Sequence, residues 1–145
     1  MKVAKDAEPQ IDGTFAPLFD GKTLNGWHTI TGSAKYSVVD GCILGETDPK
    51  MKQNSFLATD KKDYFNFIFV CDFKWVEHGN SGVIFRGQTN DKGGAYGPQA
   101  EMDDSVRAWS AGIYNEGFEW KYSLSREDQE AARKAVKLDD WNRMT

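Results

Sequence analysis

The most informative pattern in the sequence lies between Phe65 and Trp75. Every odd position in this segment is aromatic or cysteine, and the even positions become polar towards its end. Because successive side chains of a strand point to opposite faces, the alternation predicts a long strand with one packed aromatic face. Such a face has to be buried, most simply against a second sheet. The pattern therefore predicts an antiparallel β-sandwich.

Shorter segments of the same kind, separated by turn signals, fill most of the chain. Asp40-Gly41 is a hairpin turn signal between two of them. The predicted strands are Tyr36–Val39, Cys42–Glu46, Ser55–Thr59, Phe65–Trp75, Gly82–Arg86, Gln99–Asp103, Gly112–Tyr114 and Trp120–Ser123. We expect residues 1–12 to form a flexible tail and residues 13–145 to form a single β-sandwich domain.

One helix is predicted at Arg126–Lys137. Ser125 precedes it as an N-cap, Glu127 and Asp128 lie in its first turn, and basic residues lie towards its end. These placements favour the helix dipole. Its apolar positions are mostly alanine, which is typical of a short surface helix.

The composition of the chain is informative mainly because it excludes several classes of protein. The chain has 145 residues, the length of one domain, with 39% hydrophobic and 28% charged residues, which excludes disorder and a membrane protein. The formal charge of −4 argues against a nucleic-acid partner. The longest apolar run, Phe67–Cys71, is too short to span a bilayer, and the first residues lack the apolar stretch of a signal peptide.

The cysteines and histidines give little support to a disulfide framework or a metal site. Cys42 and Cys71 lie in predicted strands, where we expect small buried hydrophobic side chains. No His or Cys residues occur together at the spacing of a zinc site. No cofactor is predicted, and the sequence leaves a divalent metal open.

Strand alternation also predicts a polar face. Within Gln99–Asp103 the three polar side chains share one face, and the two apolar side chains share the other. The same rule sets Arg86 and Tyr114 on the faces opposite to their apolar neighbours. If these strands are neighbours, their polar side chains converge on one open face that suits a sugar-like ligand. The side chains of that face are Asp72, Lys74, Arg86, Gln99, Glu101, Asp103 and Tyr114.

Four motifs, in order along the chain, carry a family likeness. Phe15–Trp27 resembles the opening of the 3-keto-disaccharide hydrolase family. Asn80–Gly87 is similar to its central motif, and Gly97–Asp104 and Gly112–Gly117 are similar to its later strands. The likeness covers residues 14–145. It implies a concanavalin-A-like jelly-roll sandwich and a secreted or periplasmic enzyme that acts on oxidised sugars.

The resemblance also bears on the C-terminus. In the family, a pair similar to Trp141-Asn142 opens a strand that further closing strands follow, whereas this chain ends at Thr145. The resemblance therefore implies a domain that lacks its closing C-terminal strands. Because a sandwich without them exposes core and sheet edges, we expect either that the chain is a fragment, inactive by itself, or that a second chain or a second copy supplies the missing strands.

Glu101 and Asp103 invite a glycosidase interpretation, but their spacing argues against it. A retaining glycosidase needs two carboxyl groups about 5–5.5 Å apart, whereas alternate residues of a strand are roughly 6.8 Å apart. Some sandwich glucanases carry a Glu-x-Asp-x-x-Glu pattern, and here its final position is Val106. Chemistry on a 3-keto-sugar needs only one base, a donor to the enolate oxygen and an acid for the leaving group.

We assign these three roles to residues of the polar face. Glu101 is the predicted base, Arg86 the predicted donor to the enolate oxygen, and Tyr114 the predicted acid or a stacking platform. Glu46, at the end of a strand, ranks below Glu101. The predicted substrate-binding residues are Gln99, Asp103, Asp72, Lys74 and Glu46.

Several of these residues also have a purely structural interpretation. Arg86 can form a salt bridge to Glu101 or Asp72, and Asp103 and Glu101 can belong to a solvated sheet face. Ser81 has no His partner in the sequence, which excludes triad chemistry. Because fold does not fix function, the alternative function is a non-catalytic, lectin-like carbohydrate-binding module. A third class is an interaction domain within a larger secreted assembly.

Overall fold

The computed structural model describes residues 9–118 and 124–145. These residues form antiparallel strands and one short helix, which confirms the all-β class predicted for a sandwich. The jelly-roll connectivity stays a prediction, and the predicted strand Trp120–Ser123 lies outside the described residues. The chain divides into two compact units, Met1–Ile68 with Thr145 and Phe69–Met144.

The first unit holds two antiparallel strand pairs. The pairs are β1 (Trp27–Ile30) with β4 (Phe56–Thr59), and β2 (Lys35–Val39) with β3 (Cys42–Glu46). Asp40 and Gly41 form the two-residue turn between β2 and β3, with φ angles of 49° and 76°. Two positive φ angles are the signature of the turn that matches the twist of a hairpin. The prediction of this hairpin is confirmed.

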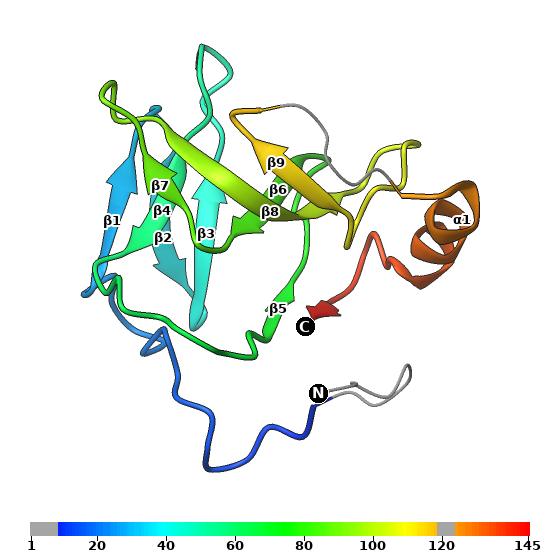
Figure 1. Cartoon of the computed structure of the whole chain (residues 1–145), viewed down its shortest axis with the longest axis horizontal. Helices are drawn as coiled ribbons and strands as arrows, with labels where there is room; N and C mark the ends of the chain where they lie inside the picture. The colour runs from blue at the N-terminus through cyan, green and yellow to red at the C-terminus, as the bar shows by residue number, and fades with distance from the viewer. Residues whose placement is uncertain (1–8, 119–123) are drawn as a thin grey trace. The chain divides into compact units, whose positions relative to one another are not determined.

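The second unit is built around β8 (Ala95–Asp103). The strands that pair with it are β6 (Asn80–Ile84), β7 (Gln88–Thr89) and β9 (Ile113–Glu116). Gln99 of β8 pairs with Ile84 of β6 and also with Tyr114 of β9. A strand residue has one neighbour on each edge, so β6 and β9 lie on opposite edges of β8 (Figure 1).

This register fixes which side chains share a face of the sheet. Residues directly opposite each other on antiparallel strands point to the same side. One face carries Asn80, Gly82, Ile84, Gln99, Glu101, Asp103 and Tyr114, and the other carries Ser81, Val83, Ala100, Met102 and Ile113. The alternation predicted for Gln99–Asp103 is therefore correct.

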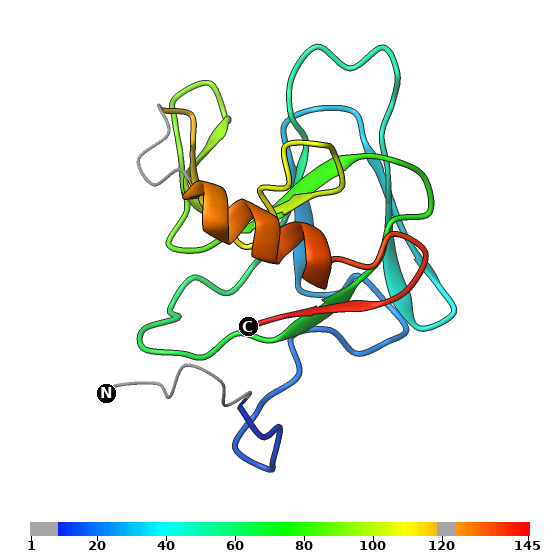
Figure 2. The same ribbon diagram turned by 90° about the vertical axis from the view of Figure 1, so that its right-hand side faces the viewer.

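The long strand predicted at Phe65–Trp75 is wrong over most of its length. Only Cys71–Phe73 forms a strand, β5, and it pairs with β10 (Asn142–Met144), as Figure 2 shows. Phe65 is 79% exposed and Phe67 is 46% exposed, so the odd positions do not form one packed face. Alternation tells which side chains could share a face. A strand also needs a hydrogen-bonding partner, and β10 offers only a short one.

The helix is α1 (Arg126–Ala135), which ends two residues before the predicted end at Lys137. The Ser125 hydroxyl accepts a hydrogen bond from the Asp128 backbone N–H at 3.0 Å, which confirms the N-cap. Beyond the helix, the Asn142 side chain accepts from the Lys137 N–H and donates to the Lys137 carbonyl, both at 2.8 Å. The Lys137 N–H and carbonyl are thus bonded to a side chain, and Lys137 lies outside the helix.

No helix within the described residues is long and apolar enough to cross a membrane.

Polar side chains are among the most buried of the described residues. Gln99, Glu101 and Asp103 expose 6%, 3% and 2% of their surface. The buried hydrophobic residues are Met102, Ala108 and Met144. The polar face of β8 was expected to be open, and this expectation is wrong: the face is closed to solvent at these three positions.

Candidate active site

The candidate site is a group of five side chains on and beside the polar face of β8. We call it the β8 polar cluster, and it consists of Asn80, Gln99, Glu101, Asp103 and Arg107. Every buried side-chain nitrogen or oxygen atom in residues 9–118 and 124–145 has a hydrogen-bond partner. The buried polar atoms of the cluster are therefore all hydrogen-bonded, as is usual in folded proteins, because burying an unpaired polar atom costs free energy.

Glu101 lies at the centre of the cluster. Its Oε1 accepts a hydrogen bond from Asn80 Nδ2 at 2.5 Å, and its Oε2 accepts one from Gln99 Nε2 at 2.9 Å. Arg107 Nη2 lies farther away, at 3.9 Å from Oε1. Two neutral amides thus fix the orientation of the carboxylate. Because each carboxylate oxygen has two lone pairs, each keeps capacity for another proton or donor.

The contact between Gln99 and Glu101 depends on the glycine at position 82. Gly82 lies directly opposite Glu101 on β6. A Cβ atom at Gly82 would lie 2.5 Å from Gln99 Cγ and 2.7 Å from the Ala100 carbonyl oxygen. Both distances are shorter than atoms tolerate, so glycine leaves the space that the Gln99 side chain occupies.

Asp103 has a different set of partners from Glu101. Its carboxylate accepts hydrogen bonds from the backbone N–H groups of Ser105 at 3.0 Å and Trp109 at 3.3 Å. Burial by itself raises the pKa of Asp103, but hydrogen bonds from Ser105 and Trp109 and the charge of Arg107 outweigh burial and hold the pKa below its usual range. The Ser110 hydroxyl also bonds to both the N–H and the carbonyl of Asp103. Asp103 therefore stays ionised and organises the loop that follows β8.

That loop, residues 104–112, is tied back to the strand and carries strain. The Glu101 N–H donates to the Gly112 carbonyl, and the Glu101 carbonyl accepts from the Ala111 N–H, both at 2.9 Å. Ala108 and Ala111 have φ angles of 53° and 67°. A left-handed conformation costs a non-glycine residue roughly 1–3 kcal/mol. The surrounding bonds thus hold the loop in a conformation that the chain alone would not favour.

Arg107 reaches the cluster from this loop. Its Nε lies 3.3 Å from Asp103 Oδ2, and its guanidinium lies over the Trp109 ring at 4.9 Å from the centroid. The side chain is 46% exposed, whereas those of Glu101 and Asp103 are 4% and 1% exposed. Arg107 and Asn80 are the exposed members of the cluster, so a ligand in solution can reach both. Arg107 could not be predicted from strand alternation, which says nothing of a loop residue, and its spacing from Asp103 was the only signal in the sequence.

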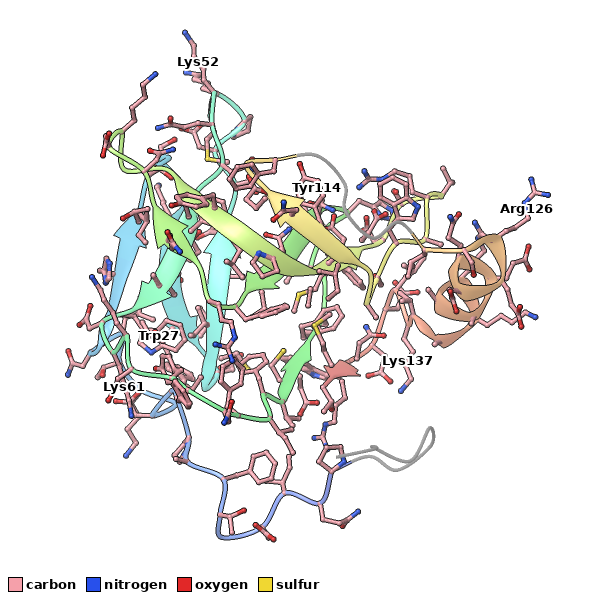
Figure 3. All side chains as sticks on the ribbon, viewed as in Figure 1. Trp27, Lys52, Lys61, Tyr114, Arg126 and Lys137 are labelled. Carbon is pink, nitrogen blue, oxygen red and sulfur yellow. The ribbon has the colours of Figure 1, made fainter. Side chains whose placement is uncertain are left out.

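Tyr114 lies beside the cluster on the neighbouring strand. Tyr114 lies on β9 (Figure 3). It stands directly opposite Gln99, so it points to the same face, and it is half-buried. Adjacent strands are about 4.8 Å apart. The structure therefore brings together four of the predicted site residues: Gln99, Glu101, Asp103 and Tyr114. It adds Asn80, which the sequence had pointed to only as the first residue of the Asn80–Gly87 motif.

Arg86 does not belong to a strand. β6 ends at Ile84, and Arg86 lies in the turn that follows, where it is exposed and has a φ angle of 53°. Strand alternation therefore does not place Arg86 on the face of Glu101, as predicted, because alternation holds only within a continuous strand and β6 ends before Arg86.

The structure does not bring Asp72 or Lys74 to the cluster. Asp72 lies on β5 and accepts two hydrogen bonds from Arg143, at 2.8 Å from Nε and 2.9 Å from Nη2. Lys74 Nζ lies 5.1 Å from the centroid of the Trp141 ring. Glu46 is exposed at the end of β3 in the first unit. Asp72 and Lys74 thus contact the C-terminal segment, on a different sheet from β8.

A second ionisable pair lies just beyond the ends of β6 and β8. His78 Nδ1 is 2.9 Å from Asp104 Oδ2, and the same oxygen accepts the Gly79 N–H at 3.1 Å. The Asp104 side chain is 7% exposed and that of His78 is 87% exposed. Within residues 9–118 and 124–145, no three or more His, Cys, Asp or Glu side chains are grouped so that they could hold a metal ion.

Comparison with known proteins identifies the family. No curated protein matches the chain. A family model described as the 3-keto-alpha-glucoside-1,2-lyase-like domain matches residues 14–145, a span that includes every member of the β8 polar cluster. The resemblance seen in the four sequence motifs is confirmed, and the chain belongs to the 3-keto-alpha-glucoside-1,2-lyase-like family.

Proposed function

We propose that this domain cleaves 3-keto-glycosides by elimination across C1 and C2 of the oxidised sugar. The family description supports this class of substrate. The observation that carries the proposal is the environment of Glu101, a buried carboxylate whose two oxygens are both held by side-chain amides. A carboxylate that is fixed in position and keeps unused lone pairs suits a general base.

The reaction needs a single base because the C3 carbonyl acidifies the hydrogen at C2. The base takes the C2 proton, the C2–H electron pair forms a C2=C3 bond, and the carbonyl electrons move to the C3 oxygen. When the C3 carbonyl re-forms, a C1=C2 bond develops and the glycosidic oxygen leaves C1 with a proton from an acid. Addition of water across C1 and C2 then gives the 3-keto-sugar, so the net reaction is hydrolysis.

Glu101 suits the base better than Asp103 does. Glu101 accepts hydrogen bonds from two amide side chains, whereas Asp103 accepts backbone N–H groups that hold the loop after β8. Proton transfer to Asp103 would weaken those bonds and the ion pair with Arg107. The Asn80 and Gln99 amides that bind Glu101 can keep their positions when the Glu101 carboxylate takes a proton.

Tyr114 is the proposed acid for the leaving oxygen, and Gln99 is proposed to orient the sugar. The two residues are direct cross-strand neighbours on the face of Glu101. A base and an acid on adjacent strands can flank C2 and C1 of one sugar ring, because strands lie about 4.8 Å apart. This support comes from strand register, and catalysis by Tyr114 is tested below.

The alternative is a non-catalytic carbohydrate-binding module. Such a module would recognise a sugar through exposed aromatic rings and would not need a buried carboxylate. The burial of Glu101 therefore favours the enzyme. A periplasmic or secreted location, and association with a second chain or a second copy, remain proposals that rest on the family resemblance.

Two readouts on one substrate test the function. The purified protein is incubated in D₂O with 4-nitrophenyl 3-keto-α-glucoside, and both release of nitrophenol and deuterium incorporation at C2 are followed. We expect the wild-type protein to release nitrophenol. Glu101→Gln keeps the shape of the side chain and loses its basicity, so it should lower the rate about 10²–10⁴-fold and still bind the substrate.

The matched control is Glu127→Gln, which removes the same charge from the exposed first turn of α1. It should react at the wild-type rate. Binding of the substrate without cleavage or exchange by the wild-type protein would favour the lectin-like module. Undiminished cleavage by Glu101→Gln would remove Glu101 as the base.

A further inference from the structure

Among the residues that the structure describes, Arg107 is the cation that lies within 4 Å of the proposed base. It ion-pairs with Asp103 at 3.3 Å and lies 3.9 Å from Glu101. Its side chain is about half exposed, so a ligand in solution can reach Arg107 while it contacts the buried carboxylates. The guanidinium has five N–H donors, so it can contact a carboxylate and bind a ligand at the same time.

The position of Arg107 is held by contacts other than the carboxylates. Its Nε bonds to the Ser105 hydroxyl at 3.2 Å, and its guanidinium lies over the Trp109 ring. The loop itself is anchored, because Asp103 binds the backbone of Ser105 and Trp109. Arg107 is thus a pre-positioned cation, which is what stabilising a developing negative charge requires.

We propose that Arg107 touches the substrate and donates a hydrogen bond to its C3 oxygen. This proposal rests on the proposed function and gives Arg107 the role that the sequence analysis assigned to Arg86. When Glu101 takes the C2 proton, the C3 carbonyl oxygen gains the electron pair and becomes an enolate oxygen. Arg107 stabilises that charge without transferring a proton, and the charge returns to the leaving oxygen when the C1–O bond breaks.

The assignment explains the selectivity that such an enzyme needs. A glycoside with a hydroxyl at C3 has no carbonyl to accept negative charge. Its hydrogen bond with Arg107 therefore does not become stronger during a reaction. The interaction strengthens only in the transition state of a 3-keto-sugar. Removal of Arg107 should therefore lower kcat with little change in KM.

The experiment compares Arg107→Ala, Arg107→Lys and the wild-type protein in C2 deuterium exchange and in nitrophenol release. We expect kcat to fall about 10²–10³-fold in Arg107→Ala. Arg107→Lys keeps the charge and loses the planar fork, so its kcat should fall less. Added guanidinium ion below denaturing concentrations should restore part of the activity of Arg107→Ala, and sodium chloride at the same concentration should not.

The control is Arg126→Ala, which removes an arginine from the exposed start of α1 (Figure 3). It should keep the wild-type kcat, and an equal loss in this variant would overturn the proposal. A wild-type kcat in Arg107→Ala, or in Arg107→Lys if the alanine variant does not fold, would also overturn it. A wild-type protein that neither exchanges nor cleaves the substrate would overturn the proposed function itself. Exchange that survives unchanged in the Arg107 variants would overturn only the role of Arg107.

Discussion

Gly82 lies directly opposite Glu101 in the β6–β8 pair. Because Gly82 has no side chain, the Gln99 side chain can occupy the space beside it and donate a hydrogen bond to Glu101. The polar side chains of β8 are thus shaped by a residue that carries no polar group. This relationship leads to a test that separates the packing of the cluster from its chemistry.

Gly82→Ala should destabilise the protein by roughly 1–3 kcal/mol, since the new methyl group overlaps Gln99 and the Ala100 carbonyl. Urea unfolding monitored by tryptophan fluorescence measures the free energy of unfolding. Gly13→Ala is the control, because a Cβ there meets no atom within 4 Å. Equal stability of the two variants would contradict the close approach at Gly82.

Asp103 should make the stability of the protein depend on pH in the acidic range. Its pKa in the folded protein lies below that of the unfolded chain, which is about 3.9 for Asp. The stabilisation is therefore fully present well above that pH and is lost as the pH falls through the lower, folded-state pKa. Asp103→Asn should cost roughly 2–3 kcal/mol at pH 7, the value of a hydrogen bond to a charged group.

Free energies of unfolding of wild type and Asp103→Asn, measured from pH 7 to pH 2, check this prediction. The difference between the two proteins should shrink at the acidic end. Asp139→Asn, at an exposed position, is the control. A difference that stays constant with pH would show that the charge of Asp103 does not stabilise the loop.

Tyr114→Phe should have an effect that depends on the leaving group. A phenolic acid matters for a poor leaving group such as an alkoxide and matters little for nitrophenolate, which leaves without a proton. We expect a loss of about 10²-fold or more with methyl 3-keto-α-glucoside and a near wild-type rate with the nitrophenyl substrate. Equal losses with the two substrates would point to a role in packing or binding.

Asp72→Asn should leave catalysis unchanged. Asp72 is paired with Arg143 on a sheet separate from β8, and the side chains of both residues are more than 40% exposed. An exposed ion pair contributes about 0–1 kcal/mol, so the variant should unfold at nearly the wild-type urea concentration. A raised KM for the 3-keto-glucoside would restore Asp72 as the substrate-binding residue that the sequence analysis proposed.

Cys71 should react slowly with iodoacetamide at pH 8. Burial, with a smaller contribution from the charge of Asp72, raises the pKa of its thiol to about 11, so little thiolate is present. Mass spectrometry of peptides after timed labelling measures the rate, and labelling in urea provides the reference. Equal rates in the folded and unfolded protein would contradict the burial of Cys71.

The features predicted correctly from the sequence are those whose cause is local. Asp40 and Gly41 can adopt positive φ angles, so they define the β2–β3 hairpin without help from the rest of the chain. Ser125 caps the helix that starts one residue later, through a bond to Asp128. Alternation along β8 correctly sorted Gln99 and Glu101 from their apolar neighbours, because the geometry of one strand decides it.

The prediction for Phe65–Trp75 was wrong for the opposite reason. Its alternation is as regular as that of β8, yet only Cys71–Phe73 has a strand beside it. Hydrogen-bonding partners come from distant parts of the chain, and no property of the segment itself reveals them. The same holds for Arg86, where the strand ended two residues earlier than the alternation suggested.

The sequence by itself determined the β class, the family and the identity of the polar residues that share a face of β8. Only the tertiary structure decided that this face is closed to solvent, that Asn80 and Arg107 join Glu101 there, and that Asp72 and Lys74 do not. The physical reason is that burial and ion pairing depend on which strands and loops meet. The contacts between strands and loops depend on the whole fold, whereas the direction of a side chain within a strand depends only on its immediate neighbours.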